Sequence, residues 1–276
     1  LDSTEHVGPE GLEPPFATAI ARAYNDWLAD FVAEAPHRMF GAAMVAPHDV
    51  DGAVLEARRC VEELGFKAVF LSPNVVNRKP WHHPDYDPLW AEVERLGVAL
   101  TFHGGGLTKL TPDFARHGLD ELMLWHTFNQ PLAIQFTTAS LCGGGVLERF
   151  PDLRVGLLEG NCSWAPWLLD RLDEHHEWAG WFEGAELTMK PSAYFRRQCF
   201  LSIEAEERTG PQYVDWFGDD NLLFSTDYPH GDSQYPHAVD TFDELDLTEA
   251  TKAKICGPNW ERLYRIPATK QAGRPS

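Results

Sequence analysis

Basic residues and cysteines are few in this sequence, and each low count excludes particular kinds of protein. Basic residues number 23 against 42 acidic ones, which gives a formal net charge of −19. Because a surface this negative repels phosphate groups, neither nucleic acid nor a membrane is expected as a partner. The cysteines are odd in number and form no C-x-x-C pair, which favours a reducing, cytoplasmic compartment over a disulfide framework; they are Cys60, Cys142, Cys162, Cys199 and Cys256.

Long apolar runs are absent as well. No stretch approaches the roughly 18 apolar residues of a membrane span, and no basic-then-apolar signal peptide opens the chain. The sequence begins at LDSTEHV without an initiator methionine, so we expect a longer protein whose start is missing here. Hydrophobic residues still make up 43% of the 276 residues, which predicts one globular domain over 1–276 with a frayed tail at 267–276.

Several enzyme motifs are matched only in part. HGGG at 103–106 matches the oxyanion loop of some esterases, yet the chain has no G-x-S-x-G nucleophile elbow. HEWAG at 176–180 lacks the second histidine of an H-E-x-x-H zinc site, and no G-x-G-x-x-G follows a strand. The glycine runs also lack the lysine and hydroxyl residue of a phosphate loop. These absences count against serine esterases, zinc proteases and nucleotide-binding folds.

Helical periodicity and apolar runs alternate along the chain. Helical spacing is found over 15–35, 49–65, 87–97, 130–150, 163–179 and 206–217, and two short helices close the fold. Continuous apolar runs, typical of strands buried on both faces, occupy 38–46, 66–72, 98–104, 153–160, 199–204 and 221–227. A long loop covers 105–128. The pattern predicts an α/β protein with a parallel sheet, but six strands alone do not decide between a doubly wound sheet and a barrel.

Polar residues stand where the predicted strands end. His103, Glu159, Glu204 and Asp227 each close one apolar run. Because parallel strands end at one edge of the sheet, we expect these side chains to converge there as a donor set for zinc or manganese. Taken singly, His103 could be a core histidine and Glu159 a helix cap. The charge of Asp227 at the end of a buried strand is harder to explain without a function.

Five segments carry a family resemblance. In chain order they read AYNDWLADFVAEAPHRMFGAAMVAP, ALTFHGG, ERFPDLRVGLLEGNCSWAPWLLDRLDEH, LLFSTDYPH and GPNWERLYRI. Together they resemble the amidohydrolase-related family, in the branch that includes aminocarboxymuconate-semialdehyde decarboxylase. The likeness spans nearly all of residues 15–266.

The resemblance implies a distorted (β/α)8 TIM barrel of the metal-dependent hydrolase type. The six strands would be the third to the eighth of that barrel, so strands one and two are expected to be missing. The family's first strand ends in an H-x-H or acid-x-H metal motif. Residues 1–14 offer only Thr4, Glu5 and His6, which follow no strand.

The resemblance also implies a site and a cofactor. His103 and Asp227 would hold one divalent metal, for which zinc is expected and manganese is the alternative. Asp227 would shuttle a proton, and Glu159 would act as a base or contact the substrate. The decarboxylases carry a catalytic histidine at the position of Glu159, and this departure makes His126 another candidate catalytic residue.

Three further residues are candidates for contacting the substrate or supporting the metal ligands, namely His230, Arg78 and Trp164. The expected reaction is hydrolysis or nonoxidative decarboxylation of a small organic acid, and the resemblance implies a homodimer. The alternative is an inactive fragment, or an interaction protein built on a decayed barrel.

Overall fold

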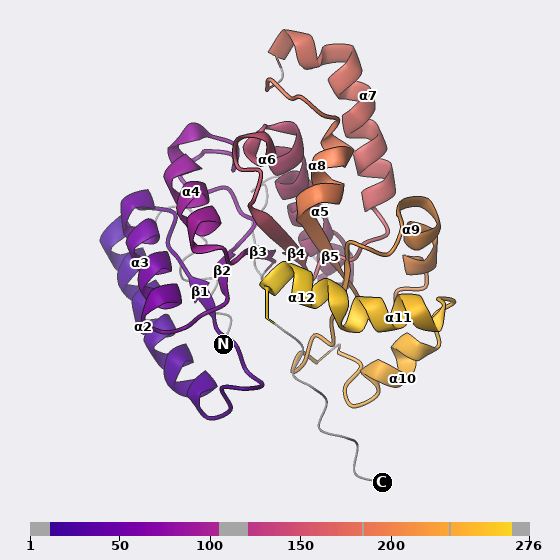
Figure 1. Cartoon of the computed structure of the whole chain (residues 1–276), viewed down its shortest axis with the longest axis horizontal. Helices are drawn as coiled ribbons and strands as arrows, with labels where there is room; N and C mark the ends of the chain where they lie inside the picture. The colour runs from indigo at the N-terminus through magenta and orange to yellow at the C-terminus, as the bar shows by residue number, and fades with distance from the viewer. Residues whose placement is uncertain (1–11, 105–120, 184, 232, 267–276) are drawn as a thin grey trace.

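A parallel sheet forms the centre of the molecule (Figure 1). The computed structural model describes residues 12–104, 121–183, 185–231 and 233–266. The N-terminal Thr4, Glu5 and His6 and the expected tail at 267–276 lie outside these ranges. The six strands are β1 (Ala42–Met44), β2 (Ala68–Leu71), β3 (Ala99–His103), β4 (Arg154–Leu158), β5 (Cys199–Ile203) and β6 (Leu222–Phe224).

The strands lie in sequence order, β1-β2-β3-β4-β5-β6, and every neighbouring pair is parallel. A doubly wound sheet reverses its strand order at a switch point, whereas a (β/α) barrel adds each strand beside the previous one. The observed order therefore favours the barrel type of winding. It also confirms the α/β architecture with a parallel sheet that the sequence pattern predicts.

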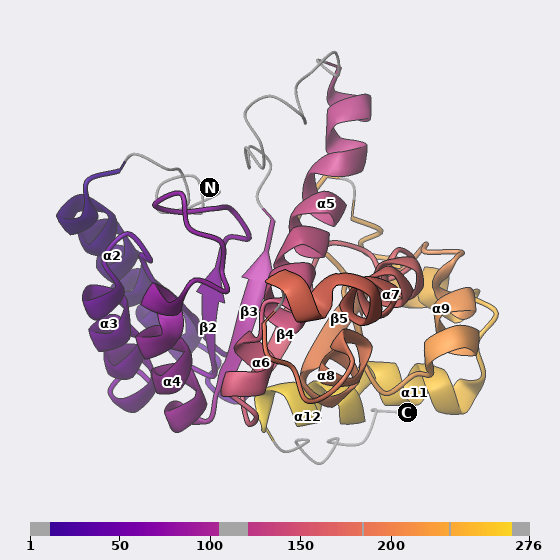
Figure 2. The ribbon, with the colours of Figure 1, turned by 90° about the horizontal axis from the view of Figure 1, so that it is seen from above.

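Helices connect the strands and cover the outer face of the sheet (Figure 2). Alternate strand residues point to this face and pack with the helices in the main hydrophobic core, for example Val69, Leu100, Leu157 and Leu201. The α-helices are α2 (Pro14–Ala33), α3 (Val50–Glu62), α4 (Asp87–Leu96), α5 (Leu122–Gly143), α6 (Val146–Arg149), α7 (Ala165–Glu183), α8 (Pro191–Gln198), α9 (Gly210–Phe217), α10 (Ala238–Asp243), α11 (Glu249–Cys256) and α12 (Pro258–Tyr264), with a 3-10 turn at Pro84–Tyr86.

Helix α5 corrects the prediction of a loop over 105–128. The helix begins at Leu122 and runs through Pro131, whereas the sequence pattern places its start beside this proline. Proline is common in the first turn of a helix and costly inside one, so the sequence signal favours the later start. Residues 105–120 lie outside the described ranges.

Two other expectations about helices were wrong. Helix α8 is a helix where an irregular segment was expected, because its eight residues are too few to show a clear period. In the described part of the chain, three short helices, α10, α11 and α12, follow the last strand instead of two. The predicted helix at 206–217 begins later, at Gly210, because the preceding residues form a loop with a structural role described below.

The inner face of the sheet is covered by α12. Leu263 of this helix packs there with Ala68, Phe200 and Leu223. The helix lies at the strand starts, where the Arg154 guanidinium donates a 2.8 Å hydrogen bond to the Leu263 carbonyl (Figure 2). The opposite end of the inner face, where the strands finish, is left for polar side chains.

The outer edge of β1 is satisfied by a side chain of α2. The Asn25 amide donates to the Met44 carbonyl and accepts from the Met44 N–H, both at 2.8 Å. These are the groups that face away from β2, so Asn25 takes the place of a neighbouring strand at this point. The same amide donates to Glu56 of α3 at 2.9 Å.

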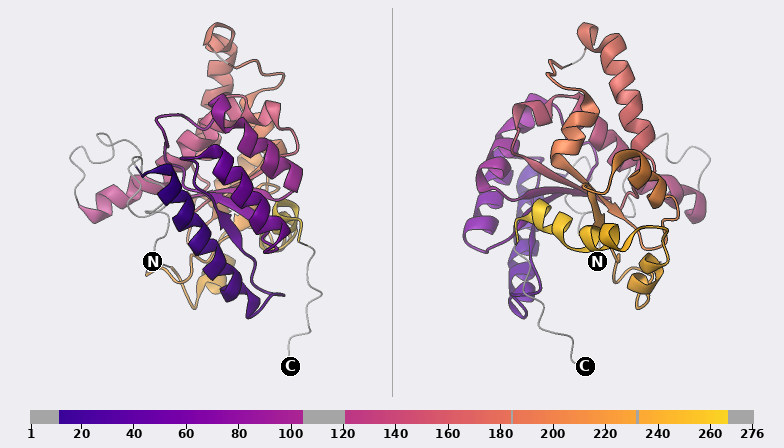
Figure 3. Two further views of the ribbon diagram at one scale, coloured as in Figure 1. Left: turned by 90° about the vertical axis from the view of Figure 1, so that its left-hand side faces the viewer. Right: turned by 45° about the vertical axis from the view of Figure 1, so that its right-hand side comes forward.

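Helix α7 projects from the body of the molecule (Figure 3). Its outer half exposes three aromatic side chains, with Trp178 at 74%, Trp181 at 82% and Phe182 at 70% exposure. Among the described helices, none is both long and apolar enough to traverse a bilayer. The cysteines are free thiols, as the dispersed pattern predicts.

Candidate metal centre

The predicted side chains do converge at the carboxyl ends of the strands. His103 is the last residue of β3, Glu159 follows β4, Glu204 follows β5 and Asp227 lies just beyond β6. Glu204 and Glu159 line the same cavity as Asp227. His103 lines a smaller cavity of about 160 Å³ that also touches Glu159 and lies toward α12.

Glu159 reaches this site through an unusual backbone conformation. Leu158 points to the inner face, so a continued strand would direct Glu159 outward. Glu159 instead adopts a left-handed φ of 53°, and Asp227 does the same at 53°. Non-glycine residues adopt this conformation at a cost, so surrounding contacts must hold both turns. The turn brings the Glu159 carboxylate beside His103.

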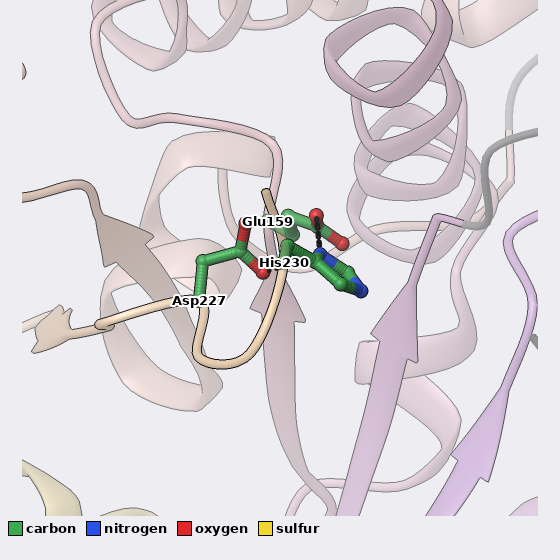
Figure 4. Close-up of side chains that lie close together, drawn as sticks. All are labelled: Glu159, Asp227 and His230. Carbon is green, nitrogen blue, oxygen red and sulfur yellow. Dashed lines mark ion pairs between the residues drawn. The ribbon is translucent and has the colours of Figure 1, made fainter. Parts of the chain in front are cut away.

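Short contacts join two histidines to two carboxylates. His103 Nε2 lies 2.7 Å from Glu159 Oε2, and His230 Nδ1 lies 2.7 Å from Asp227 Oδ1. His230 Nδ1 is also 3.4 Å from Glu159 Oε1. Glu159, Asp227 and His230 point toward one another, with ligand atoms within 4.8 Å of each other (Figure 4). His230 is therefore itself a candidate ligand. Its position in the sequence suggested only that it supports the ligands or contacts the substrate.

The ring of His103 is oriented by the backbone. Its Nδ1 lies 2.6 Å from the Gly104 carbonyl, an acceptor that requires a proton on Nδ1. The Nε2 atom is left to face Glu159, as in metal-binding histidines whose second nitrogen is fixed by a carbonyl. Burial lowers the pKa of His103, but the Glu159 carboxylate, the Gly104 carbonyl and the charge of Asp227 together outweigh this, and the pKa lies above its ordinary value.

The donor atoms fit a divalent metal. Glu159 Oε2 is buried and accepts no hydrogen bond of good geometry from the described residues, although His103 Nε2 is 2.7 Å away. An acceptor in this situation is costly unless a cation or a water completes it. Imidazole nitrogens with carboxylate oxygens suit zinc and also manganese. The residues that could hold the metal are His103, Glu159, Asp227 and His230.

The cavity beside these groups has a volume of about 400 Å³ and is rich in acids. Among the described residues that line it, none is a lysine or an arginine. Burial, together with the charges of Asp227, Glu207 and Glu159, raises the pKa of Glu204 to about 8. Glu204 therefore holds a proton at neutral pH. The sequence pattern predicts Glu204 as one of the converging metal donors, and the structure places it in the cavity but outside the set of close contacts among His103, Glu159, Asp227 and His230.

His126 also lines this cavity, although it lies in the first turns of α5 and not in a loop. Gly104 allows the helix to approach the end of β3, because a Cβ at this position would lie 2.6 Å from Cγ of Gln130. Sequence reasoning missed Gln130, which lines the cavity with His126. Residues separated by a long stretch of chain give no sequence signal for such an approach.

The other two candidates lie outside the cluster. Arg78 is exposed in the loop after β2. Trp164 packs partly against the main core, and its indole N–H donates to the Gly160 carbonyl at 2.6 Å. Trp164 thus supports the turn that carries Glu159 and is not part of the cavity wall.

A larger cavity, of about 850 Å³, lies between α5, α7 and the loop after β2. Its walls are mainly apolar and include Trp81, Phe136 and Leu172. None of the described residues that line it is acidic. The chemistry of the strand-end cavity makes it the stronger candidate for an active site.

Comparisons with known proteins identify relatives in sequence and solved structures of similar fold. Gamma-resorcylate decarboxylase of Rhodococcus jostii (strain RHA1) is 30% identical over 263 residues, which cover 91% of this chain and 78% of the relative. The crystal structure of 5-carboxyvanillate decarboxylase LigW from Sphingomonas paucimobilis matches with a TM-score of 0.78 and 26% identity, covering 93% of this chain and 75% of that one.

A second structure shares the fold. Dihydroxybenzoic acid decarboxylase from Polaromonas sp. JS666, with bound manganese and the inhibitor 2-nitroresorcinol, has a TM-score of 0.78 at 24% identity and covers 99% of this chain and 82% of its own. The family model described as Amidohydrolase matches residues 6–266. This chain therefore belongs to the amidohydrolase family, as its sequence motifs predict.

Proposed function

We propose that this protein is a metal-dependent carboxy-lyase that removes CO2 nonoxidatively from a small aromatic acid. The observation that carries the proposal is the meeting of His103, Glu159, Asp227 and His230 beside one cavity at the strand ends. The decarboxylase relatives support the same reaction class. One divalent metal, zinc or manganese, would be held by these residues.

The metal would supply positive charge that polarises a substrate oxygen. Such charge matters here because the described residues lining the cavity include no lysine or arginine to attract an acid. Glu159 after β4 and Asp227 after β6 would hold the metal from two strands separated by β5, while the Gly104 carbonyl keeps His103 Nε2 directed at it.

The chain's own residues would deliver the proton that decarboxylation requires. Decarboxylation breaks a C–C bond to release CO2, and a C–H bond forms at the same carbon, so one proton must be delivered. The Asp227–His230 pair lies at the cavity and can hold that proton. Glu204 is a second candidate reservoir, because its burial in the same cavity favours the protonated form. His126 would contact the substrate from α5.

Hydrolysis is the second candidate, and Glu159 is the observation that favours it. A carboxylate next to a metal site can act as general base toward water. The two reactions break different bonds: an acid loses CO2, whereas its ester is hydrolysed to the acid and an alcohol. A panel of hydroxybenzoic acids and their esters, scored for CO2 and for hydrolysis products, therefore separates them.

Metal content tests the proposal directly. The purified chain, freed of metal and then incubated separately with Zn²⁺ and Mn²⁺, should retain about one ion per chain by elemental analysis. His103→Ala and Asp227→Asn should each lose it, while Asp220→Asn, an exposed acid paired with Lys254, should retain it. Equal metal content in all variants, or none in the unaltered chain, would contradict the proposal.

Two further expectations remain proposals. The exposed aromatic side chains on α7 support a homodimer, because surface patches of this kind commonly mark contacts between chains. The cytoplasmic location stays a prediction from the free, dispersed cysteines.

A further inference from the structure

One buried carboxylate outside the proposed ligand set connects two loops of the site. Glu207, 7% exposed, lies between β5 and α9. Its Oε1 accepts hydrogen bonds from the N–H groups of Cys162 and Ser163, both at 2.9 Å, and from the Ser163 hydroxyl. Its Oε2 accepts from the Glu204 N–H at 3.3 Å. Glu207 thus ties the loop after β4 to the loop after β5.

The loop after β4 needs such support. Glu159 and Asn161 both have left-handed φ angles, of 53° and 58°, in a turn that leads directly to Cys162. Each such residue costs on the order of 1 kcal/mol or more, and it persists only where neighbouring contacts fix it. The start of the turn is held by the Glu159 N–H, which donates to Ser202 Oγ at 2.7 Å. Glu207 holds the other end.

The bonding demands of Glu207 cannot be met by a neutral amide. The N–H and O–H groups that contact Glu207 are all donors, and they occupy both carboxylate oxygens. A glutamine offers one oxygen and one NH2 group, so at least one backbone N–H would face another donor. Charge-assisted hydrogen bonds from backbone N–H groups are also about twice as strong as neutral ones.

We propose that Glu207 is a positioning residue for the metal site. It fixes the turn at 159–163 so that the Glu159 carboxylate stays directed at His103 and His230. This inference rests on the proposed function, in which Glu159 contributes to the metal site. A carboxylate that only stabilised the fold would affect unfolding but leave the geometry around the metal unchanged.

The test uses Co²⁺ as a probe, because its visible absorption reports the ligand geometry directly. The Glu207→Gln variant is compared with Glu148→Gln, whose carboxylate makes a similar set of bonds elsewhere, accepting from the Thr188 hydroxyl at 2.9 Å and from the Tyr194 hydroxyl. Urea unfolding measures the stability of both. We expect Glu207→Gln to shift the Co²⁺ bands and weaken Co²⁺ binding by about 10- to 100-fold. Glu148→Gln should lose stability with an unchanged spectrum.

A milder variant covers the case in which Glu207→Gln does not fold. Ser163→Ala removes a single donor to Glu207 and should change the Co²⁺ spectrum in the same direction by a smaller amount. Wild-type spectra and affinities in the folded variants would overturn the positioning role while leaving the metal site intact. Failure of the wild-type chain itself to bind Co²⁺ would instead refute the proposed metal site, and this role with it.

Discussion

Removing the Asn25 side chain should destabilise the protein far more than its size suggests. Asn25 is fully buried and makes hydrogen bonds at 2.8 to 2.9 Å to the Met44 N–H, the Met44 carbonyl and Glu56. In Asn25→Ala, both Met44 groups stay buried at the edge of β1 without a partner, since Met44 is only 1% exposed. Each unsatisfied group costs about 1–3 kcal/mol, so the expected loss is about 2–6 kcal/mol.

Urea unfolding followed by circular dichroism measures this loss. Asp30→Ala, an exposed position on the same helix, serves as the control and should change stability by less than about 0.5 kcal/mol. A loss below about 1 kcal/mol for Asn25→Ala would refute the reasoning, because water would then be replacing the amide at the strand edge.

Asn25→Asp adds a test of the mechanism. An ionised carboxylate still accepts from the Met44 N–H but repels the Met44 carbonyl and Glu56. A protonated carboxyl regains one donor, so folding favours the protonated form and raises the pKa of the new group. The variant should therefore recover stability relative to wild type as the pH falls. An equal deficit at all pH values would contradict the assigned hydrogen bonds.

Two predictions concern pH. Because folding raises the pKa of Glu204 to about 8, the metal-free protein should lose stability between about pH 5 and pH 8, and Glu204→Gln should remove this decline in urea unfolding. Hydrogen bonds from Arg95 and Arg58 lower the pKa of Glu92 to about 2, so its contribution is present above its ordinary pKa and is lost as the pH falls toward 2. Glu92→Gln should destabilise the protein by about 1–3 kcal/mol at pH 7 and flatten its acid denaturation curve.

The sheet and the general location of the site were predictable from the sequence. Buried parallel strands are continuous apolar runs, and a polar residue that ends such a run must lie at the carboxyl edge. His103, Glu159 and Asp227 gave this signal, and the structure brings them close together. Their roles as ligands remain to be tested by metal content.

Other features of the site cannot be predicted from the residues that surround them in the sequence. Glu207 binds residues 44 and 45 positions away, and nothing in its own neighbourhood distinguishes it from a surface acid. The position of His126 on a helix was hidden because α5 passes through Pro131, against the local preference. The left-handed turn at Glu159 depends on tertiary contacts such as the one with Ser202. Contacts between residues that are distant in the sequence determine all three features: the hydrogen bonds of Glu207, the helical position of His126 and the turn at Glu159.

The position of α12 has a consequence for synthesis of the chain. Arg154 of β4 bonds to Leu263, 109 residues later, and α12 covers the inner face of strands that precede it. On the ribosome, all of these strands therefore emerge before the helix that covers them. Until residues 258–264 appear, the nascent sheet exposes an apolar trough, the state in which a growing chain is most prone to aggregate or to bind a chaperone. Covering of this face of the sheet therefore waits for the translation of α12.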